Sequence, residues 1–295
     1  MSTLKITYTS VDGEVLATSS GADKAELTVN NLCEKELITF SADKESFVWA
    51  QVGDGMKESL IFAKTGEFSF TIPSGEDKQG FSADAFEGEQ KIILRAANKT
   101  ELATYRNLAL NPLDARLPEE VNDPDAPEWS NPTDSCAIAE GKIAAFPHAY
   151  ANRITRNEGC FFARNAIDGC TFQGGHGAYP YHSWGGAVHE DLSLTVYFGR
   201  TVLADNIALY LRSDFSLNEK GQEHDTYWHT AVIEFSGGEM MEIKPIKTGD
   251  AQFFPFPQKK TEWVKLQRLD PFHTEKSQNF AALNQIEIWG KDITE

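Results

Sequence analysis

The sequence has no surplus of positive charge and no long apolar run. Its 27 lysines and arginines stand against 44 aspartates and glutamates, which gives a net charge of −17. Nucleic acid is bound by a basic surface, so this balance excludes nucleic acid as the expected partner. No apolar run approaches the roughly 20 residues that a membrane helix needs, and we expect no membrane partner either.

Cysteine is scarce and carries no metal-binding pattern. The four cysteines are Cys33, Cys136, Cys160 and Cys170. They form no CxxC pair and no zinc-ribbon spacing, which argues against a structural zinc site. Free, buried thiols are expected, and a bridge between Cys160 and Cys170 across the intervening loop stays open.

An apolar signal core is also missing. Residues 1–5 lead straight into strand-like sequence, so the chain as given is expected to be cytoplasmic. The alternative is a secreted protein whose leader has been removed. The sequence does not indicate an oligomeric state.

An acidic, proline-rich segment divides the chain. Residues 113–133 contain four prolines and six acidic residues but a single arginine. Proline removes a backbone N–H donor and the like charges repel, so we predict a linker here. The prediction places an accessory β-sandwich domain at residues 1–112 and a second domain at residues 134–295.

The first domain consists of short apolar runs separated by turn signals. These runs lie at residues 27–29, 37–40, 47–52, 68–72 and 92–96. Strands of this length and spacing are typical of an antiparallel sandwich. No histidine occurs before residue 148, and we predict no chemistry in this half.

The second domain is also β-rich. Leu192, Leu194, Val196 and Phe198 alternate with polar residues, which is the two-residue period of a half-buried strand. Gly199 is expected to end this strand. Further strands are predicted at residues 207–211, 231–235, 263–266 and 285–289. The predicted class is therefore all-β, with two β-sandwich domains, of which the second is a jelly roll.

Two motifs enclose most of this second half. Residues 163–169 read Ala-Arg-Asn-Ala-Ile-Asp-Gly, and residues 282–290 read Ala-Leu-Asn-Gln-Ile-Glu-Ile-Trp-Gly. With the Trp-Gly-Gly turn and the histidines between them, they resemble the galactose-binding-like β-sandwich of the coagulation factor 5/8 type C (discoidin) family and its carbohydrate-binding-module relatives. The resemblance covers residues 134–295. It implies a domain that binds a glycan or small saccharide without catalysis.

The resemblance also implies a structural calcium ion. In the family an Asp-Gly loop and the last strand hold this ion, and calcium prefers such oxygen ligands. Asp168 matches the loop carboxylate. The last-strand position that is usually glutamate is Gln285 here, a departure that removes one negative ligand. The alternative is that Asp168 and Gly169 form only a turn with an Asx hydrogen bond.

The saccharide site implied by the resemblance combines His, Arg and Asn/Asp side chains with one stacking aromatic ring. Sugar hydroxyls need fixed donors and acceptors, and the C–H face of a pyranose packs on an aromatic ring. This chain concentrates such residues at 176–184 and 212–229. The predicted ligand-binding residues are His176, His182, Trp184, Arg212, Asp214, His224, Asp225 and Trp228. For the two tryptophans, a place in the core is the alternative.

Two other classes of function remain as alternatives. A metal-dependent or acid–base enzyme would use the same histidines, but no His-Glu-x-x-His motif occurs, and His224 and His229 would point to opposite faces of a strand. No Gly-x-Ser-x-Gly or Cys-His signature is present, so no catalytic residue is predicted. A protein-interaction module would dock its partner on the apolar residues 253–256.

Overall fold

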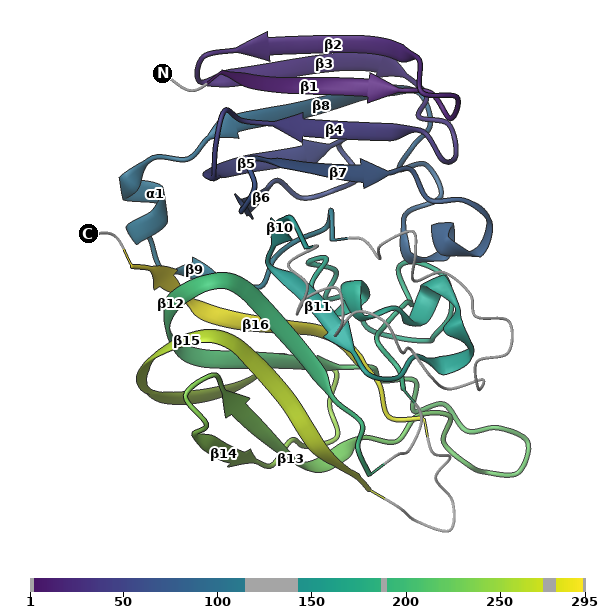
Figure 1. Cartoon of the computed structure of the whole chain (residues 1–295). Helices are drawn as coiled ribbons and strands as arrows, with labels where there is room; N and C mark the ends of the chain where they lie inside the picture. The colour runs from purple at the N-terminus through teal and green to yellow at the C-terminus, as the bar shows by residue number, and fades with distance from the viewer. Residues whose placement is uncertain (1–2, 115–142, 187–189, 273–279, 294–295) are drawn as a thin grey trace.

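The computed structural model describes residues 3–114, 143–186, 190–272 and 280–293. Strands dominate these ranges, and the predicted all-β class is confirmed (Figure 1). Within them, no helix combines the length and apolar character needed to cross a membrane. Most of the predicted linker, residues 115–133, lies outside the described residues, so the domain boundaries stay a prediction. Leu113 and Asp114, the first two residues of that linker, are buried.

The first half of the chain is a sandwich of two antiparallel sheets. In the described residues, one sheet has the order β2 (Val15–Gly21), β1 (Leu4–Thr9), β4 (Leu37–Ser41), β7 (Glu67–Thr71). The other has the order β10 (Ala145–Phe146), β6 (Ser59–Ala63), β5 (Ser46–Val52), β8 (Glu89–Ala96), β3 (Lys24–Asn30). Alternate side chains of both sheets, among them Ile6, Phe40 and Ile92, pack into one core. The five runs predicted as strands are confirmed, and β2 and β6 were not predicted.

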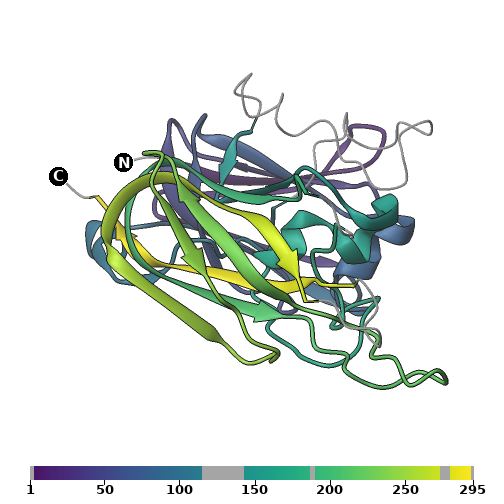
Figure 2. The same cartoon turned by 90° about the horizontal axis from the view of Figure 1, so that it is seen from below.

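The second half is built on one long, curved sheet. Its order in the described residues is β14 (Met240–Ile243), β13 (Trp228–Phe235), β15 (Gln252–Pro271), β12 (Leu194–Leu211), β16 (Leu283–Asp292), β9 (Arg106–Asn107). β11 (His148–Ala151) pairs with β12 as well. The long strands β12 and β15 curve strongly (Figures 1 and 2), and a separate core forms beneath them.

The alternation predicted for β12 is confirmed for its apolar face, because Leu194, Val196 and Phe198 are all fully buried. The other face is less open than predicted, since Thr195 is also buried. The prediction that Gly199 ends this strand was wrong. Gly199 has a φ of +68°, and the pairing with β15 shifts register between Tyr197 and Val202. The irregularity is a bulge that bends the strand and lets it continue.

Short helices carry the connections. They are η1 (Gly75–Gly80), α1 (Lys99–Ala103), η3 (Thr155–Asn157), η4 (Gly159–Phe161) and η5 (Ala163–Ala166). The last three follow one another closely and lie beside the second sheet, where they shape the region that carries most of the predicted site residues. Cys33, Cys160 and Cys170 are free thiols, so the bridge left open between the last two does not form. Cys136 lies outside the described residues.

The two halves are tied together by exchanged strands. β10, which follows the proline-rich segment, pairs with β6 of the first half. β9, which precedes that segment, pairs with β16 of the second half. Phe62 and Phe146 form a small shared core, and the Arg200 guanidinium lies 5.4 Å above the Phe62 ring. The second half is therefore held in one orientation against the first.

Candidate functional site

An open pocket lies at the end of the second half where β12 stops. Its empty volume, including the solvent-open mouth, is about 510 Å³. The charged and aromatic side chains of its lining are Arg156, Phe161, His176, Arg212, His224 and Phe280. Three of these belong to the predicted ligand-binding set. They come from the glycine-rich loop at residues 174–177, the end of β12 and the segment before β13.

The floor of the pocket is a buried ion pair. The Arg212 guanidinium donates to the Asp225 carboxylate through Nε at 3.0 and 3.1 Å and through Nη2 at 2.7 Å. The side chains are 4% and 0% exposed, respectively. The backbone N–H of Asp214 also donates to Asp225, at 2.6 Å. Because both side chains of the ion pair are buried and share several hydrogen bonds, this network holds the pocket in one geometry.

An aromatic stack stands on that network. His224 Nδ1 lies 2.8 Å from Asp225 Oδ1, and since a carboxylate only accepts, this nitrogen donates the proton. The His224 ring lies between two others: His176 at 3.9 Å and Phe280 at 5.3 Å between ring centroids. Phe280 is 40% exposed, so its ring is available to a ligand.

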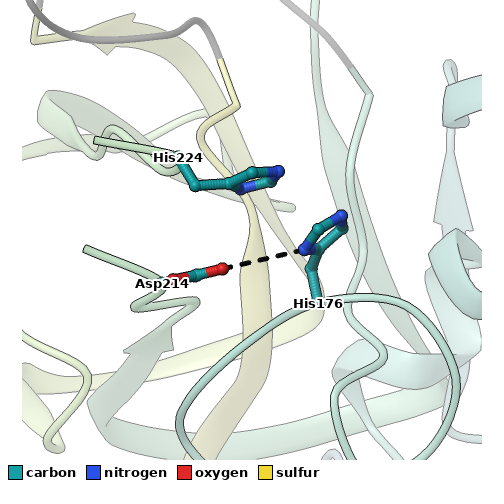
Figure 3. Close-up of side chains that lie close together, drawn as sticks. All are labelled: His176, Asp214 and His224. Atoms are coloured by element: carbon teal, nitrogen blue, oxygen red, sulfur yellow. Dashed lines mark ion pairs between the residues drawn. The ribbon is translucent and has the colours of Figure 1, made fainter. Parts of the chain in front are cut away.

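His176 completes the polar wall, and Asp214 lies next to it outside the pocket lining. The His176 Nδ1 lies 3.9 Å from Asp214 Oδ2 (Figure 3). Burial, with His224 and Arg212 nearby, lowers the pKa of His176, so the ring is neutral at pH 7. The hydroxyl of Ser216 donates to Asp214 at 2.5 Å and lowers the pKa of this carboxyl group, which keeps it ionised.

Arg156 forms the opposite rim. It has a φ of +50°, a left-handed conformation that is uncommon outside glycine and that clusters at functional sites. Its guanidinium pairs with Glu158 at 2.7 Å and lies 5.3 Å over the Phe161 ring. The rim therefore offers a cation and a carboxylate beside an aromatic face.

Three predicted site residues lie elsewhere. Trp184 and Trp228 are buried in the core with ring centroids 5.8 Å apart. Trp184 also exchanges both backbone hydrogen bonds with Leu283 and so anchors the last strand. His182 is buried beside Tyr179, with its Nε2 2.5 Å from Asp168 Oδ2. The structure thus places these three side chains outside the pocket lining, and places Asp214 and Asp225 behind it.

In the loop predicted to hold calcium, the oxygen atoms that would bind the ion accept hydrogen bonds from the protein itself. Asp168 Oδ1 accepts from the backbone N–H of Cys170 at 2.7 Å, which is the Asx turn of the alternative interpretation. Its other oxygen faces His182. Gln285 Oε1 accepts from the Gly169 N–H at 3.0 Å.

A lysine completes this arrangement. Lys57 Nζ, from the first half, donates to the Gly169 carbonyl at 2.6 Å. A calcium ion needs six or more oxygen ligands, and here the oxygens of Asp168, Gln285 and Gly169 all accept from N–H groups of the protein. As arranged, these residues do not fit the ion. Calcium at this loop stays a prediction for elemental analysis.

Sequence reasoning missed Phe280, Arg156 and Phe161. Phe280 is 56 residues from the His224 ring on which it stacks, so no local pattern connects the two. Arg156 had one weak signal, the turn-forming Arg-Asn-Glu-Gly sequence at residues 156–159.

No protein-family model matches this sequence, and neither does any curated protein. Solved structures do match. The family 32 carbohydrate-binding module of NanJ from Clostridium perfringens, in complex with galactose, is 17% identical. The match covers 48% of this chain and 91% of that module, with a TM-score of 0.35.

Two further structures show the same extent of similarity. Chitosan-binding module 2 of a chitosanase/glucanase from Paenibacillus sp. IK-5, in complex with chitotriose, is 14% identical. That match covers 49% of this chain and 96% of the module, with a TM-score of 0.35. The lectin binding domain of lectinolysin complexed with Lewis b is 15% identical over 49% of this chain and 92% of that domain, with a TM-score of 0.34. At these identities and TM-scores, the likeness carries no argument about this chain.

Proposed function

We propose that this chain binds a glycan in the pocket formed by His176, His224, Arg212, Arg156 and Phe280, and that it does so without catalysis. One observation carries the proposal: a pre-organised polar wall and an exposed aromatic ring face the same open pocket.

The polar wall supplies the hydrogen bonds that a sugar needs. Asp225 fixes His224 through Nδ1, which leaves Nε2 as an acceptor for a sugar hydroxyl. The neutral His176 adds a second imidazole beside it. Because Arg212 and Asp225 already hold each other, a ligand meets these groups without first ordering them.

Phe280 supplies the apolar contact. A pyranose has one face of C–H groups, which packs on an aromatic ring while its hydroxyls point to polar groups. The ring of Phe280 is backed by His224 on one side, so only its other face and edges are open to a ligand. The expected ligand is therefore a sugar unit whose C–H face packs against the open edge of the Phe280 ring, with its hydroxyls toward His224 and His176.

The test is calorimetric titration of the full chain with a panel of oligosaccharides, starting with galactose, chitotriose and Lewis b. Phe280→Ala should weaken binding about tenfold or more, because covering a phenylalanine is worth about 1.5–3 kcal/mol and 1.4 kcal/mol is a factor of ten. His176→Ala should weaken it too. Phe253→Ala is the matched control, since Phe253 is an exposed phenylalanine outside the pocket lining.

Two results count against the proposal. Binding that is equal in the wild type and in Phe280→Ala and His176→Ala would move the glycan to another site. The absence of binding to any glycan of a broad array would reject the function itself.

A further inference from the structure

Three side chains at the rim of the pocket form a group suited to a metal ion. The ligand atoms of His176, Asp214 and His224 all lie within 4.8 Å of one another (Figure 3). In the described part of the chain, no other group of three or more His, Cys, Asp or Glu side chains meets this condition. The three come from separate segments: the loop at 174–177, the residues after β12 and the residues before β13.

From this geometry we infer that His176, Asp214 and His224 bind a divalent transition-metal ion of the zinc class. Two imidazole nitrogens and one carboxylate oxygen are the mixed ligands that such ions prefer, whereas calcium and magnesium take oxygens. Three protein ligands leave a fourth position open. His176 and His224 also line the pocket, so that position faces the space where a ligand enters.

The surroundings of His224 match those of a metal-binding imidazole. Its Nδ1 donates to Asp225, so Nε2 carries the free lone pair, which in the metal-bound form binds the ion in place of a sugar hydroxyl. Metal-bound histidines almost always donate their other ring N–H to a carboxylate or carbonyl, which fixes the ring and its tautomer. Arg212 in turn holds that carboxylate with three hydrogen bonds. The buried pair of Arg212 and Asp225 therefore orients the His224 imidazole for metal binding as well as supporting the pocket.

The remaining requirement is a short inward movement of His176. Two ligand atoms on one zinc ion lie roughly 3.5 Å apart, because each bond is about 2.0–2.2 Å. The ligand atoms of the group, which lie within 4.8 Å of one another, must therefore approach by at most about 1.3 Å. His176 now stacks face to face on His224, and its ring must turn to aim a lone pair at the ion. Its loop permits this: Gly174, Gly175 and Gly177 all have positive φ.

Metal binding is measured on the full chain after treatment with a chelator and dialysis. Titration with Zn²⁺ should show one ion per chain, and Co²⁺ should give the strong visible absorption of a four-coordinate site. His176→Ala and Asp214→Asn should each weaken Zn²⁺ binding by at least 10–100-fold, roughly the loss caused by removing even an outer-shell partner. His229→Ala is the control, because His229 also faces a carboxylate, Asp270 at 3.4 Å, but lies outside the group.

Circular dichroism in the presence of chelator checks that each variant folds. If His176→Ala does not fold, Zn²⁺ binding by Asp214→Asn is the test. The inference is overturned if the wild type takes up no stoichiometric Zn²⁺, or if His176→Ala and Asp214→Asn bind it as the wild type and His229→Ala do. Glycan titration with chelator present separates this inference from the proposed function. If the chain binds glycan normally with chelator present, the proposed function is supported whether or not the chain binds Zn²⁺.

Discussion

Replacing Arg212 by methionine removes the cation from a carboxylate that has no exposed surface. Asp225 then stays buried with the Asp214 N–H and His224 as its remaining partners. Breaking a buried ion pair by removing one partner costs about 3–5 kcal/mol, because the remaining charge is uncompensated. At roughly 2–4 °C per kcal/mol for a folding unit of 150–250 residues, the Tm should fall by about 6–20 °C.

Differential scanning calorimetry measures this shift, and Arg153→Met is the matched control. Arg153 makes the same two-pronged contact with Asp191, with Nε and Nη2 each 2.9 Å from a carboxylate oxygen, but the side chains are 25% and 61% exposed. Exposed pairs contribute about 0–1 kcal/mol, so this variant should melt within a few degrees of the wild type. Equal Tm values for the two variants would refute the argument from burial. Arg212 is therefore a poor probe of ligand binding alone, and Phe280 is a better one.

Thiol reactivity, one glycine and one lysine give three further tests. Burial raises the pKa of Cys160 to about 12 whereas Cys33 is exposed, so at pH 8 a thiol reagent followed by mass spectrometry should modify Cys33 first, and equal rates would contradict this. Gly199→Ala places a Cβ 2.3 Å from the Phe146 ring at positive φ, and urea unfolding should show a loss of about 1–3 kcal/mol; an unchanged midpoint would argue against the close contact. Adding Ca²⁺ to the chelator-treated chain should leave the Tm unchanged, and Lys57→Ala should lower the Tm because it removes the hydrogen bond to the Gly169 carbonyl. Calcium found by elemental analysis would support the calcium prediction instead.

The strands of the fold were largely predictable, and their bends were not. Alternation around Val196 reports which face is buried, because side chains on a strand point to opposite sides in turn. Gly199 signals an irregularity, but the same residue suits a turn or a bulge, and only the pairing with β15 decides. The apolar residues 253–257 became part of β15, with Phe253 outside and Phe256 inside.

The site was predictable by residue type and not by position. Arg212 and His224 were identified because sugar recognition calls for such side chains, and they do line the pocket. Phe280 and Arg156 join them through contacts across long stretches of chain, which no local pattern encodes. His182 has a side chain suited to sugar binding, but its Nε2 contacts Asp168 Oδ2, and this contact keeps the side chain inside the protein.

The exchanged strands β9 and β10 also bear on how the protein avoids aggregation. An uncovered sheet edge presents unpaired N–H and C=O groups, which are a template for pairing with other chains. β10 covers β6, and β9 covers β16, each with residues from the far side of the proline-rich segment. Cutting the chain in that segment and separating the pieces would uncover β6 in one piece and β16 in the other. Each half of the molecule thus contributes a strand that covers one sheet edge of the other half, where another chain could otherwise pair.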